Sequence, residues 1–335
     1  MPVMLPPLDE VLAGASVVSV PMRVRFRGVT VREAVLLQGP LGWGEFSPFV
    51  EYEDVEAASW LAAGLEAGWT GWPTPLRDQV PVNATVPAIG AEEVAALLDR
   101  FDGCDTVKVK VAEPGQSVAE DLARVRAVRA HWPDAAIRVD ANGAWSVAEA
   151  MTALRALSEV GLQYVEQPCR TVEELVELRH ALDRDRVQVP LAADESIRKA
   201  DDPLRVARSG AVEFAVVKVA PLGGVAATLT IADQLAALGV RMVVSSALDT
   251  SVGIAAGLAA AGALPDEPLA CGLGTVTFFT ADVCEDPLLP VAGRLPVRAH
   301  APVPNPAPFA ADAARTAWWI DRLTRCWRVL EARAS

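Results

Sequence analysis

Five short stretches of the 335-residue chain decide its fold: TVKVKV (106–111), AIRVDAN (136–142), LQYVEQP (162–168), VPLAADES (189–196) and FAVVKVA (214–220). Each is a mainly apolar run that carries a charged residue at or near its end, and a helix-like segment separates it from the next. Continuous apolar runs are typical of strands buried on both faces of a parallel sheet. With VPVNATV (80–86) before them and VRMVVSS (240–246) after them, the series predicts a closed (β/α) barrel.

The residues before this series predict a small α+β unit. VVSVPMRVRF (17–26) alternates apolar and polar positions, and VREAVLLQGPLGWGEFSP (31–48) follows a turn at Gly28, so both indicate a meander. Residues 54–68 have helical spacing, and the Pro/Trp-rich stretch 68–81 marks a boundary. The last 45 or so residues are Pro-rich and then helical over 317–332, a tail that we expect to pack on the first unit.

Composition excludes several classes of protein and of partner. The chain has 30 basic and 43 acidic residues, a net charge of −13, and no Lys/Arg-rich run, which argues against nucleic acid and anionic membrane as partners. The longest uncharged apolar run, 250–265, is shorter than the ~20 residues that span a bilayer, so it predicts a buried helix. The N-terminal sequence has no secretion-like pattern and predicts a cytoplasmic location.

The five cysteines include no CxxC pair, and their number is odd. We expect reduced thiols that serve as packing. The three histidines, at positions 131, 180 and 300, are expected at the surface. A histidine base is therefore not predicted.

Charged residues recur at the ends of the apolar runs. Lys108 and Lys110 are two positions apart, which places both side chains on one face of a strand, toward the barrel interior. The other members of the set are Asp140, Glu166, Asp194, Glu195 and Lys218. In a barrel, chemistry is placed at the carboxyl ends of the strands. A buried charge is costly without a partner, so we expect these groups to partner one another.

Asp140, Glu166 and Asp194 would supply an all-oxygen set suited to a hard divalent cation, Mg²⁺ or Mn²⁺. Zinc is disfavoured because no His or Cys accompanies them. A lysine among other cations loses proton affinity, so Lys110 or Lys218 could act as a base beside such a cation. Taken singly, each residue is better explained as a structural charge paired at the barrel rim. The recurrence of the whole set at the same place in consecutive units favours a site.

The motifs KVK (108–110), VDAN (139–142), VEQP (165–168), ADES (193–196) and VKVAPLGG (217–224), in this order, resemble the enolase superfamily in its muconate-lactonizing subgroup. The resemblance implies a (β/α)7β TIM-like barrel with an α+β capping domain. On this basis we predict a capping domain over 1–78, a catalytic barrel over 79–285 and a C-terminal segment, 286–335, that packs back on the cap.

A closer resemblance, carried by stretches such as PMRVRFRG (21–28), GWGEFSPFVEY (42–52) and KVKVAEPGQS (108–117), is to a dehydratase branch of this subgroup. It implies a lyase that converts 2-succinyl-6-hydroxy-2,4-cyclohexadiene-1-carboxylate to 2-succinylbenzoate by syn dehydration, a step of menaquinone biosynthesis. The superfamily uses a Lys or His base with Mg²⁺ beside an ene-diolate.

The resemblance also assigns roles residue by residue. Asp140, Glu166 and Asp194 would be the ligands of Mg²⁺ or Mn²⁺, and Lys110 the acid/base, with Lys108 and Lys218 as cations that stabilise the intermediate. Asn142 and Glu195 would support the metal ligands and lysines. Substrate contacts are expected from Ser245, Ser246, Gly272 and Gly274, although turn formation explains the glycines equally well.

Two further functions stay open. N-succinylamino acid racemases of the same superfamily use the same two lysines, so the motifs allow a 1,1-proton transfer. From a different class, the chain would be a non-catalytic metal-binding barrel, but such a scaffold is expected to have lost a ligand or a lysine. Dipeptide epimerases carry an acidic pair after the last barrel strand, whereas EPLACGLGTV (267–276) has only Glu267. The sequence is compatible with a monomer and with an oligomer.

Overall fold

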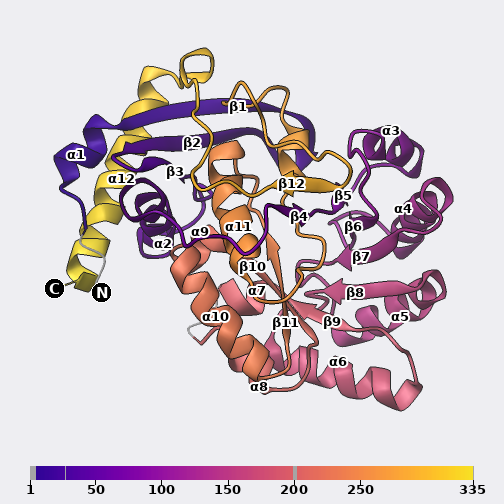
Figure 1. The fold of residues 1–335 in the computed structure, drawn as a ribbon. Helices are drawn as coiled ribbons and strands as arrows, with labels where there is room; N and C mark the ends of the chain where they lie inside the picture. Colours follow the sequence, from indigo (N-terminus) through magenta and orange to yellow (C-terminus); the bar gives the residue numbers. More distant parts are fainter. Residues whose placement is uncertain (1–4, 27, 199–201, 335) are drawn as a thin grey trace.

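The computed structural model describes residues 5–26, 28–198 and 202–334. Figure 1 shows two parts side by side: an antiparallel sheet flanked by helices, and a curled parallel sheet with helices around its outside. The antiparallel sheet contains β1 (Ala15–Phe26), β2 (Val29–Gly39) and β3 (Gly42–Phe46), in that order. We call it the capping sheet.

One face of the capping sheet is covered by α2 (Asp54–Leu65) and the π-helical turn η1 (Glu66–Thr70). Two glycines permit the close approach of α2. A Cβ added at Gly44 on β3 would lie 2.0 Å from the carbonyl oxygen of Gly64 on α2. Strand and helix are therefore in backbone contact at a position where any side chain would separate them.

The long C-terminal helix α12 (Ala313–Ala334) lies along α2 and β1 (Figure 1). Its Arg315 donates to both carboxylate oxygens of Glu33 on β2, with Nε–Oε1 at 2.8 Å, and the indole of Trp319 donates to the same carboxylate. The buried Arg322 donates to the carbonyl oxygens of Phe49 and Tyr52. These contacts fasten the tail to the capping sheet and to the segment that follows it.

The parallel sheet has seven strands in the order β11-β10-β9-β8-β7-β6-β5. Their bounds are β5 (Ala84–Val86), β6 (Thr106–Lys110), β7 (Ala136–Asp140), β8 (Leu162–Glu166), β9 (Leu191–Ala193), β10 (Phe214–Lys218) and β11 (Arg241–Ser245). Neighbouring strands of this sheet pair in parallel. The seven apolar runs thus form neighbouring strands in chain order, as the sequence predicts.

The two edges of this sheet are joined by residues 271 and 272. Cys271 bridges in parallel to Val82, just before β5, and Gly272 bridges in parallel to Ser245 at the end of β11. This short segment takes the place of an eighth strand and closes the curled sheet. The architecture is the predicted (β/α)7β barrel with an α+β cap.

The helices that follow the strands begin where the sequence marks them. α4 (Val118–His131) starts at the predicted capping box, in which Ser117 and Glu120 exchange hydrogen bonds. The next two helices, α5 (Val147–Leu157) and α6 (Val172–Asp185), start in the same way. Each box satisfies backbone N–H groups that would otherwise lack an acceptor. The later barrel helices are α10 (Val225–Ala237) and α11 (Ser251–Ala263).

Shorter elements complete the chain. They are α1 (Leu8–Ala13), α3 (Val94–Leu98), α7 (Glu195–Arg198), α8 (Arg205–Arg208), α9 (Val219–Leu222), the 3₁₀ turns η2 (Ala91–Glu93), η3 (Ser158–Val160), η4 (Gly274–Phe278) and η5 (Ala307–Phe309), and the antiparallel pair β4 (Gln79–Pro81) and β12 (Arg294–Pro296).

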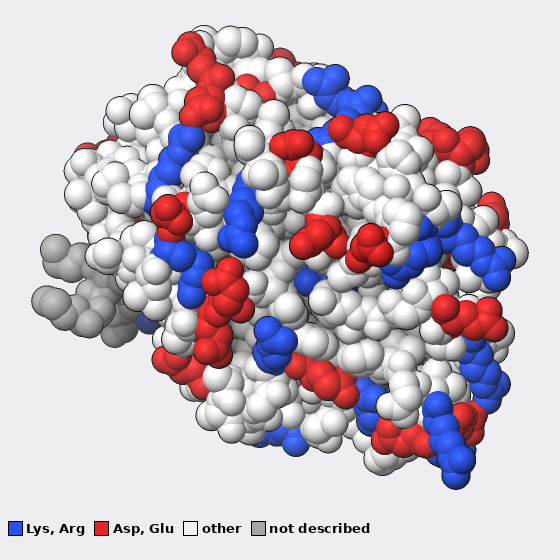
Figure 2. All heavy atoms as spheres, turned by 45° about the vertical axis from the view of Figure 1, so that its right-hand side comes forward, with Lys and Arg blue, Asp and Glu red and all other residues white. Residues whose placement is uncertain are grey.

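Two expectations from composition, a buried helix over the uncharged run and buried thiols, are confirmed. The uncharged run 250–265 forms the largely buried helix α11, and in the part of the chain that the structure describes no helix is long and apolar enough to cross a membrane. All five cysteines are buried and free. Figure 2 shows acidic and basic side chains interspersed over the face that it presents, without an extended basic patch.

Candidate active site

The charged residues predicted at the strand ends lie in one row across the barrel. Lys110 on β6 is the register partner of Asp140 on β7, and Asp140 is the register partner of Glu166 on β8. Lys218 on β10 pairs in the same way with Ser245 on β11. Because the strands are parallel, their carboxyl ends and these side chains meet at one end of the barrel.

Lys108 lies between two carboxylates. Its Nζ is 2.7 Å from Oε1 and 2.9 Å from Oε2 of Glu166, and 2.9 Å from Oδ2 of Asp140. Asp140 and Glu166 are both fully buried, and Lys108 is 7% exposed. One ammonium group thus bridges two carboxylates from neighbouring strands.

Lys110 and Asn142 form the next group. The Nζ of Lys110 lies 2.5 Å from Oδ2 of Asp140 and 2.7 Å from Oδ1 of Asn142. Asn142 is held in the left-handed region, with φ +47°, and its backbone N–H donates to the other oxygen of Asp140. Its Nδ2 donates to Glu195 at 3.3 Å. Asn142 therefore holds the amine of Lys110, and Glu195 holds the amide of Asn142. Their role as supports of the site stays a prediction.

Lys218 pairs with the third carboxylate, with its Nζ 2.5 Å from Oδ2 of Asp194. The backbone of Asp194 is positioned by Gln167, the residue after Glu166, whose Oε1 accepts from the N–H groups of Asp194 and Ser196 at 3.0 and 3.1 Å. Sequence reasoning missed Gln167. Its place inside the VEQP motif, immediately after a predicted ligand, was the available signal.

Burial and charge act in opposite directions on these groups. Burial lowers the pKa of the Lys108 ammonium, but the carboxylates of Asp140 and Glu166 outweigh it, so that pKa is raised above its usual value. Burial raises the pKa of Asp140, but Lys108 and Lys110 hold it well below its usual range. Burial and the neighbouring Asp140 raise the pKa of Glu166 to about 7. The two lysines thus keep Asp140 ionised, whereas burial next to Asp140 makes Glu166 harder to ionise.

The donor set fits a divalent cation. Asp140, Glu166 and Asp194 come from three consecutive strands and supply the oxygen ligands that hard cations prefer. In this structure ammonium groups face these carboxylates, and no three His, Cys, Asp or Glu side chains among the described residues are already grouped as a metal cluster. A divalent cation bound by these carboxylates would offset their negative charge, as the lysine ammonium groups do in this structure.

Next to the charged row is a cavity that opens between the barrel and the capping sheet. Its lining includes Lys108, Lys110, Asp140, Asn142, Asp194 and Lys218. Three of the four predicted substrate contacts, Ser245, Ser246 and Gly272, also line it. Gly274 does not; it starts η4 and faces the backbone of Asn83 and the ring of Phe101. The hydroxyl of Ser246 donates to Gly272 O and contacts Thr275 Oγ1, both at 2.8 Å.

The remaining lining residues were not predicted. They are Phe26, Phe49, Thr85, Ala247, Leu248 and Thr275. Phe26 and Phe49 come from the cap side of the molecule, and the Nζ of Lys110 lies 5.4 Å from the centre of the Phe26 ring. Both phenylalanines fall in stretches that carry the closer family resemblance, which was the only sequence signal for them.

Comparison with known proteins agrees with the fold. Residues 17–68 match the family model described as enolase N-terminal domain-like, and residues 91–302 match enolase C-terminal domain-like. An o-succinylbenzoate synthase from Mycolicibacterium smegmatis is 58% identical over 96% of this chain and 98% of its own length. The chain belongs to the o-succinylbenzoate synthase family, within the enolase-like proteins.

Other members of the o-succinylbenzoate synthase family are similarly close. The protein from Mycobacterium tuberculosis is 55% identical over 97% of each chain. Among solved structures, muconate lactonizing enzyme from Pseudomonas putida aligns with a TM-score of 0.73 at 20% identity, covering 89% of this chain and 98% of that one. L-Ala-D/L-Glu epimerase from Bacillus subtilis aligns with a TM-score of 0.72 at 22% identity, covering 87% and 96%. At such identities these two structures establish the shared fold.

Proposed function

We propose that this protein catalyses the syn dehydration of 2-succinyl-6-hydroxy-2,4-cyclohexadiene-1-carboxylate to 2-succinylbenzoate, as an o-succinylbenzoate synthase in menaquinone biosynthesis. The observation that carries the proposal is the row of three lysines and three carboxylates at one end of a barrel whose full-length relatives bear that name. The reaction removes one proton and one hydroxide from neighbouring carbons, and the ring becomes aromatic. Its requirements are a base, an acid on the same face, and positive charge near the carboxylate.

Lys110 meets the requirement for both proton transfers. It lines the cavity, and Asp140 and Asn142 hold its amine from one side. As the base, it removes the proton on the carbon that bears the ring carboxylate; as the resulting ammonium, it returns that proton to the departing hydroxyl, which leaves as water. A single group on one face of the ring accounts for the syn course.

Lys108 and Lys218 supply fixed positive charge. Lys108 is held by Asp140 and Glu166, and Lys218 by Asp194. Both line the same cavity as Lys110. Charge that builds on the substrate carboxylate after proton removal is stabilised by such preoriented cations, because they need no reorganisation at the moment of reaction.

Asp140, Glu166 and Asp194 would hold a divalent ion, which we propose to be Mg²⁺ or Mn²⁺, because all the offered ligands are carboxylate oxygens. When bound, the ion supplies further positive charge beside the substrate carboxylate. Asn142 and Glu195 hold Lys110 and the backbone after Asp140 in place. Ser245, Ser246 and Gly272, which line the cavity, are proposed to contact the substrate. A cytoplasmic location stays a prediction.

A second candidate function has one observation in its favour. Lys110 and Lys218 line the same cavity and are held by different carboxylates, so each can reach a substrate placed between them. Racemisation of an N-succinylamino acid needs two such groups, one to remove and one to deliver a proton. A non-catalytic metal-binding scaffold is less well supported, because every proposed ligand and lysine is in place.

The deciding experiment is absorbance-monitored conversion of the cyclohexadiene substrate by wild-type protein, with and without EDTA. Metal-dependent formation of 2-succinylbenzoate would support the proposal. Folded, metal-loaded protein that leaves this substrate unchanged but racemises N-succinylamino acids would replace it with the second candidate. Absence of both activities, with no exchange of a substrate-analogue α proton for solvent deuterium, would favour the scaffold.

A further inference from the structure

The capping sheet is tied to the segment after β11 by a buried arginine. Arg32 on β2 is 3% exposed, and its guanidinium donates to Leu248 O at 3.0 Å and to Ala247 O at 3.3 Å. It also donates to Ser47 O, in the chain that follows β3, and its carbon Cζ lies 4.6 Å from the centre of the Phe49 ring. One side chain thus joins two strand-end segments that are about 200 positions apart in sequence.

A buried carboxylate from the same sheet holds the other end of this segment. Glu45 on β3 is 6% exposed, and its Oε2 accepts from the N–H of Thr250 at 3.1 Å, the hydroxyl of Thr250 at 2.5 Å and the N–H of Gly253 at 3.0 Å. Thr250 is the N-cap residue of α11. A carboxylate from the cap therefore satisfies the first turn of a barrel helix, where the backbone and the helix dipole favour negative charge.

Between these two ties the backbone takes an unfavourable conformation. Leu248 has φ +62°, the left-handed region, which costs a residue with a Cβ free energy. Its carbonyl oxygen is the acceptor of Arg32 Nε. Asp249 holds the turn from within by accepting from the N–H of Ala247 at 3.0 Å. The contacts from the cap stabilise a backbone conformation that the segment would not favour alone.

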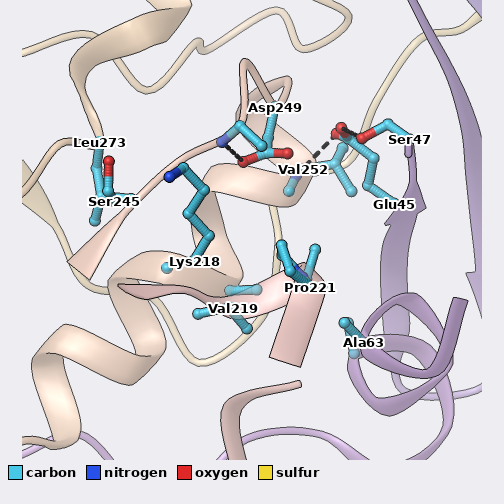
Figure 3. A pocket seen from close by; sticks show the side chains of 16 residues that line it. Glu45, Ser47, Ala63, Lys218, Val219, Pro221, Ser245, Asp249, Val252 and Leu273 are labelled. Atoms are coloured by element: carbon cyan, nitrogen blue, oxygen red, sulfur yellow. Dashed lines mark hydrogen bonds between the residues drawn. The ribbon is translucent and has the colours of Figure 1, made fainter. Parts of the chain in front are cut away.

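The segment forms a wall of the candidate active site. Ser246, Ala247 and Leu248 line the cavity that holds the three lysines, and so does Phe49, under the Arg32 guanidinium. Figure 3 shows the adjoining pocket, in which Glu45 and Ser47 on the cap side face the loop that carries Asp249, while Lys218 and Ser245 lie on the barrel side. The proposed metal ligands Asp140 and Asp194 line the same cavity from the barrel strands, outside residues 246–250.

We propose that Arg32 and Glu45 are positioning residues for the reaction: from the capping sheet they set the conformation of residues 246–250, and with it the shape of the wall against which the substrate lies. The proposal rests on the proposed function only in that the cavity holds that substrate. On this proposal the capping sheet shapes the wall that contacts the substrate, and residues of the barrel hold the cation.

The test compares disruptive variants with matched controls on the same sheet. Arg32→Met and Glu45→Ala remove the ties to the barrel, and Glu45→Gln keeps an acceptor for α11. Arg315→Met and Glu33→Ala are the controls, because that ion pair also fastens β2, but to α12 rather than to the barrel. Each protein is examined by amide hydrogen exchange, by kcat and KM for the cyclohexadiene, and by Mn²⁺ affinity.

In Arg32→Met and Glu45→Ala we expect amides of residues 247–253 to exchange about tenfold faster or more, while amides of 136–166 do not change. KM should rise by about tenfold or more with a smaller change in kcat, because a wall displaced by an ångström costs on that order. Mn²⁺ affinity should stay within about twofold of wild type. Glu45→Gln should restore most of the KM and of the protection.

The proposal would be overturned if the control variants raised KM as much as Arg32→Met and Glu45→Ala do. It would also be overturned if Arg32→Met and Glu45→Ala left amide exchange over 247–253 unchanged. If Arg32→Met does not fold, Glu45→Ala and Glu45→Gln decide. Failure of the proposed function has a different signature: wild-type protein would not convert the cyclohexadiene, yet the exchange comparison would still show whether Arg32 and Glu45 hold residues 246–250.

Discussion

Lys110 and Asp140 are direct register partners on β6 and β7, and the amine of one lies 2.5 Å from the carboxylate of the other. The pairing joins the proposed acid/base to the first proposed metal ligand. Asn142, two residues further along the chain, binds both side chains. The proposed acid/base and the first proposed metal ligand therefore lie side by side on neighbouring strands, and Asn142 contacts both.

Lys110→Met is expected to abolish most dehydration. Methionine has a similar volume but cannot accept or donate a proton, so we expect kcat to fall by about 10²- to 10⁴-fold. The measurement is absorbance-monitored turnover at saturating substrate and metal. Arg126→Met, on the outside of α4, is the control for loss of a cation and should turn over at the wild-type rate. Turnover of Lys110→Met within about threefold of wild type would remove Lys110 from the mechanism.

Glu166→Gln is expected to weaken divalent-cation binding. The substitution keeps the shape of the side chain but removes one of three anionic ligands, so Mn²⁺ or Mg²⁺ affinity should fall by at least about tenfold in a calorimetric titration. Glu177→Gln, an exposed residue on α6, makes the same chemical change away from the site and should bind as wild type does. Equal affinity in both variants would show that Glu166 is not a ligand.

The barrel and its row of charges follow from local patterns. Each of the seven strands is a short apolar run, and the parallel register then aligns Lys110, Asp140 and Glu166 without further information. Lys108 and Lys110 face the same side because they are two positions apart on a strand. Spacing and strand polarity were thus sufficient to predict which charges meet.

The cap side of the cavity follows from contacts between residues that are far apart in sequence. Arg32 and Glu45 read as ordinary polar positions of a half-exposed meander, and only the tertiary structure shows them buried against residues 247–253. Gly274 is the reverse case: it belongs to the same Gly-rich stretch as Gly272, but the 3₁₀ turn η4 places it outside the cavity lining. A one-dimensional motif does not distinguish the two glycines.

Lys218→Arg should separate dehydration from racemisation. Arginine keeps the positive charge near Asp194 but does not lose its proton, so it can stabilise charge and cannot serve as a base. If Lys218 is only a cation, dehydration should fall by about tenfold or less, while any racemisation of N-succinylamino acids should fall by about 10²-fold or more. The two rates are measured on the same preparation. Parallel losses in both reactions would mean that Lys218 transfers a proton in each.

Gly272→Ala should displace Ser245 from the cavity wall. A Cβ at residue 272 would lie 2.4 Å from Ser245 Oγ and 3.1 Å from its Cβ, so the serine has to move. We expect a loss of about 1–3 kcal/mol in stability and a higher KM. Ser245→Ala in the same chain removes the closest atom and should restore part of the stability. If the double variant did not regain stability, the strain would lie in the backbone around residue 272 and not in the contact with the Ser245 hydroxyl.

Glu45 should make stability depend on pH in the opposite direction to Glu33. Burial and the nearby Asp249 raise the pKa of Glu45 to about 7, against the opposing effects of Ser47, Thr250 and Arg32. Because the folded chain holds this proton more tightly than the unfolded chain does, its contribution is greatest below the ordinary glutamate pKa and is lost as the pH rises toward 7. The amount is on the order of 1–3 kcal/mol.

The experiment is urea unfolding of wild type, Glu45→Gln and Glu33→Gln between about pH 3 and 8, a range that extends below the ordinary glutamate pKa. Glu45→Gln should remove part of the fall in unfolding free energy with rising pH, since glutamine does not titrate. The hydrogen bond from Arg315 lowers the pKa of Glu33, so Glu33→Gln should instead remove stability that is present at neutral pH and lost toward acid. Parallel pH profiles for wild type and Glu45→Gln would show that Glu45 stays ionised in the folded protein, with Arg32 outweighing its burial and Asp249.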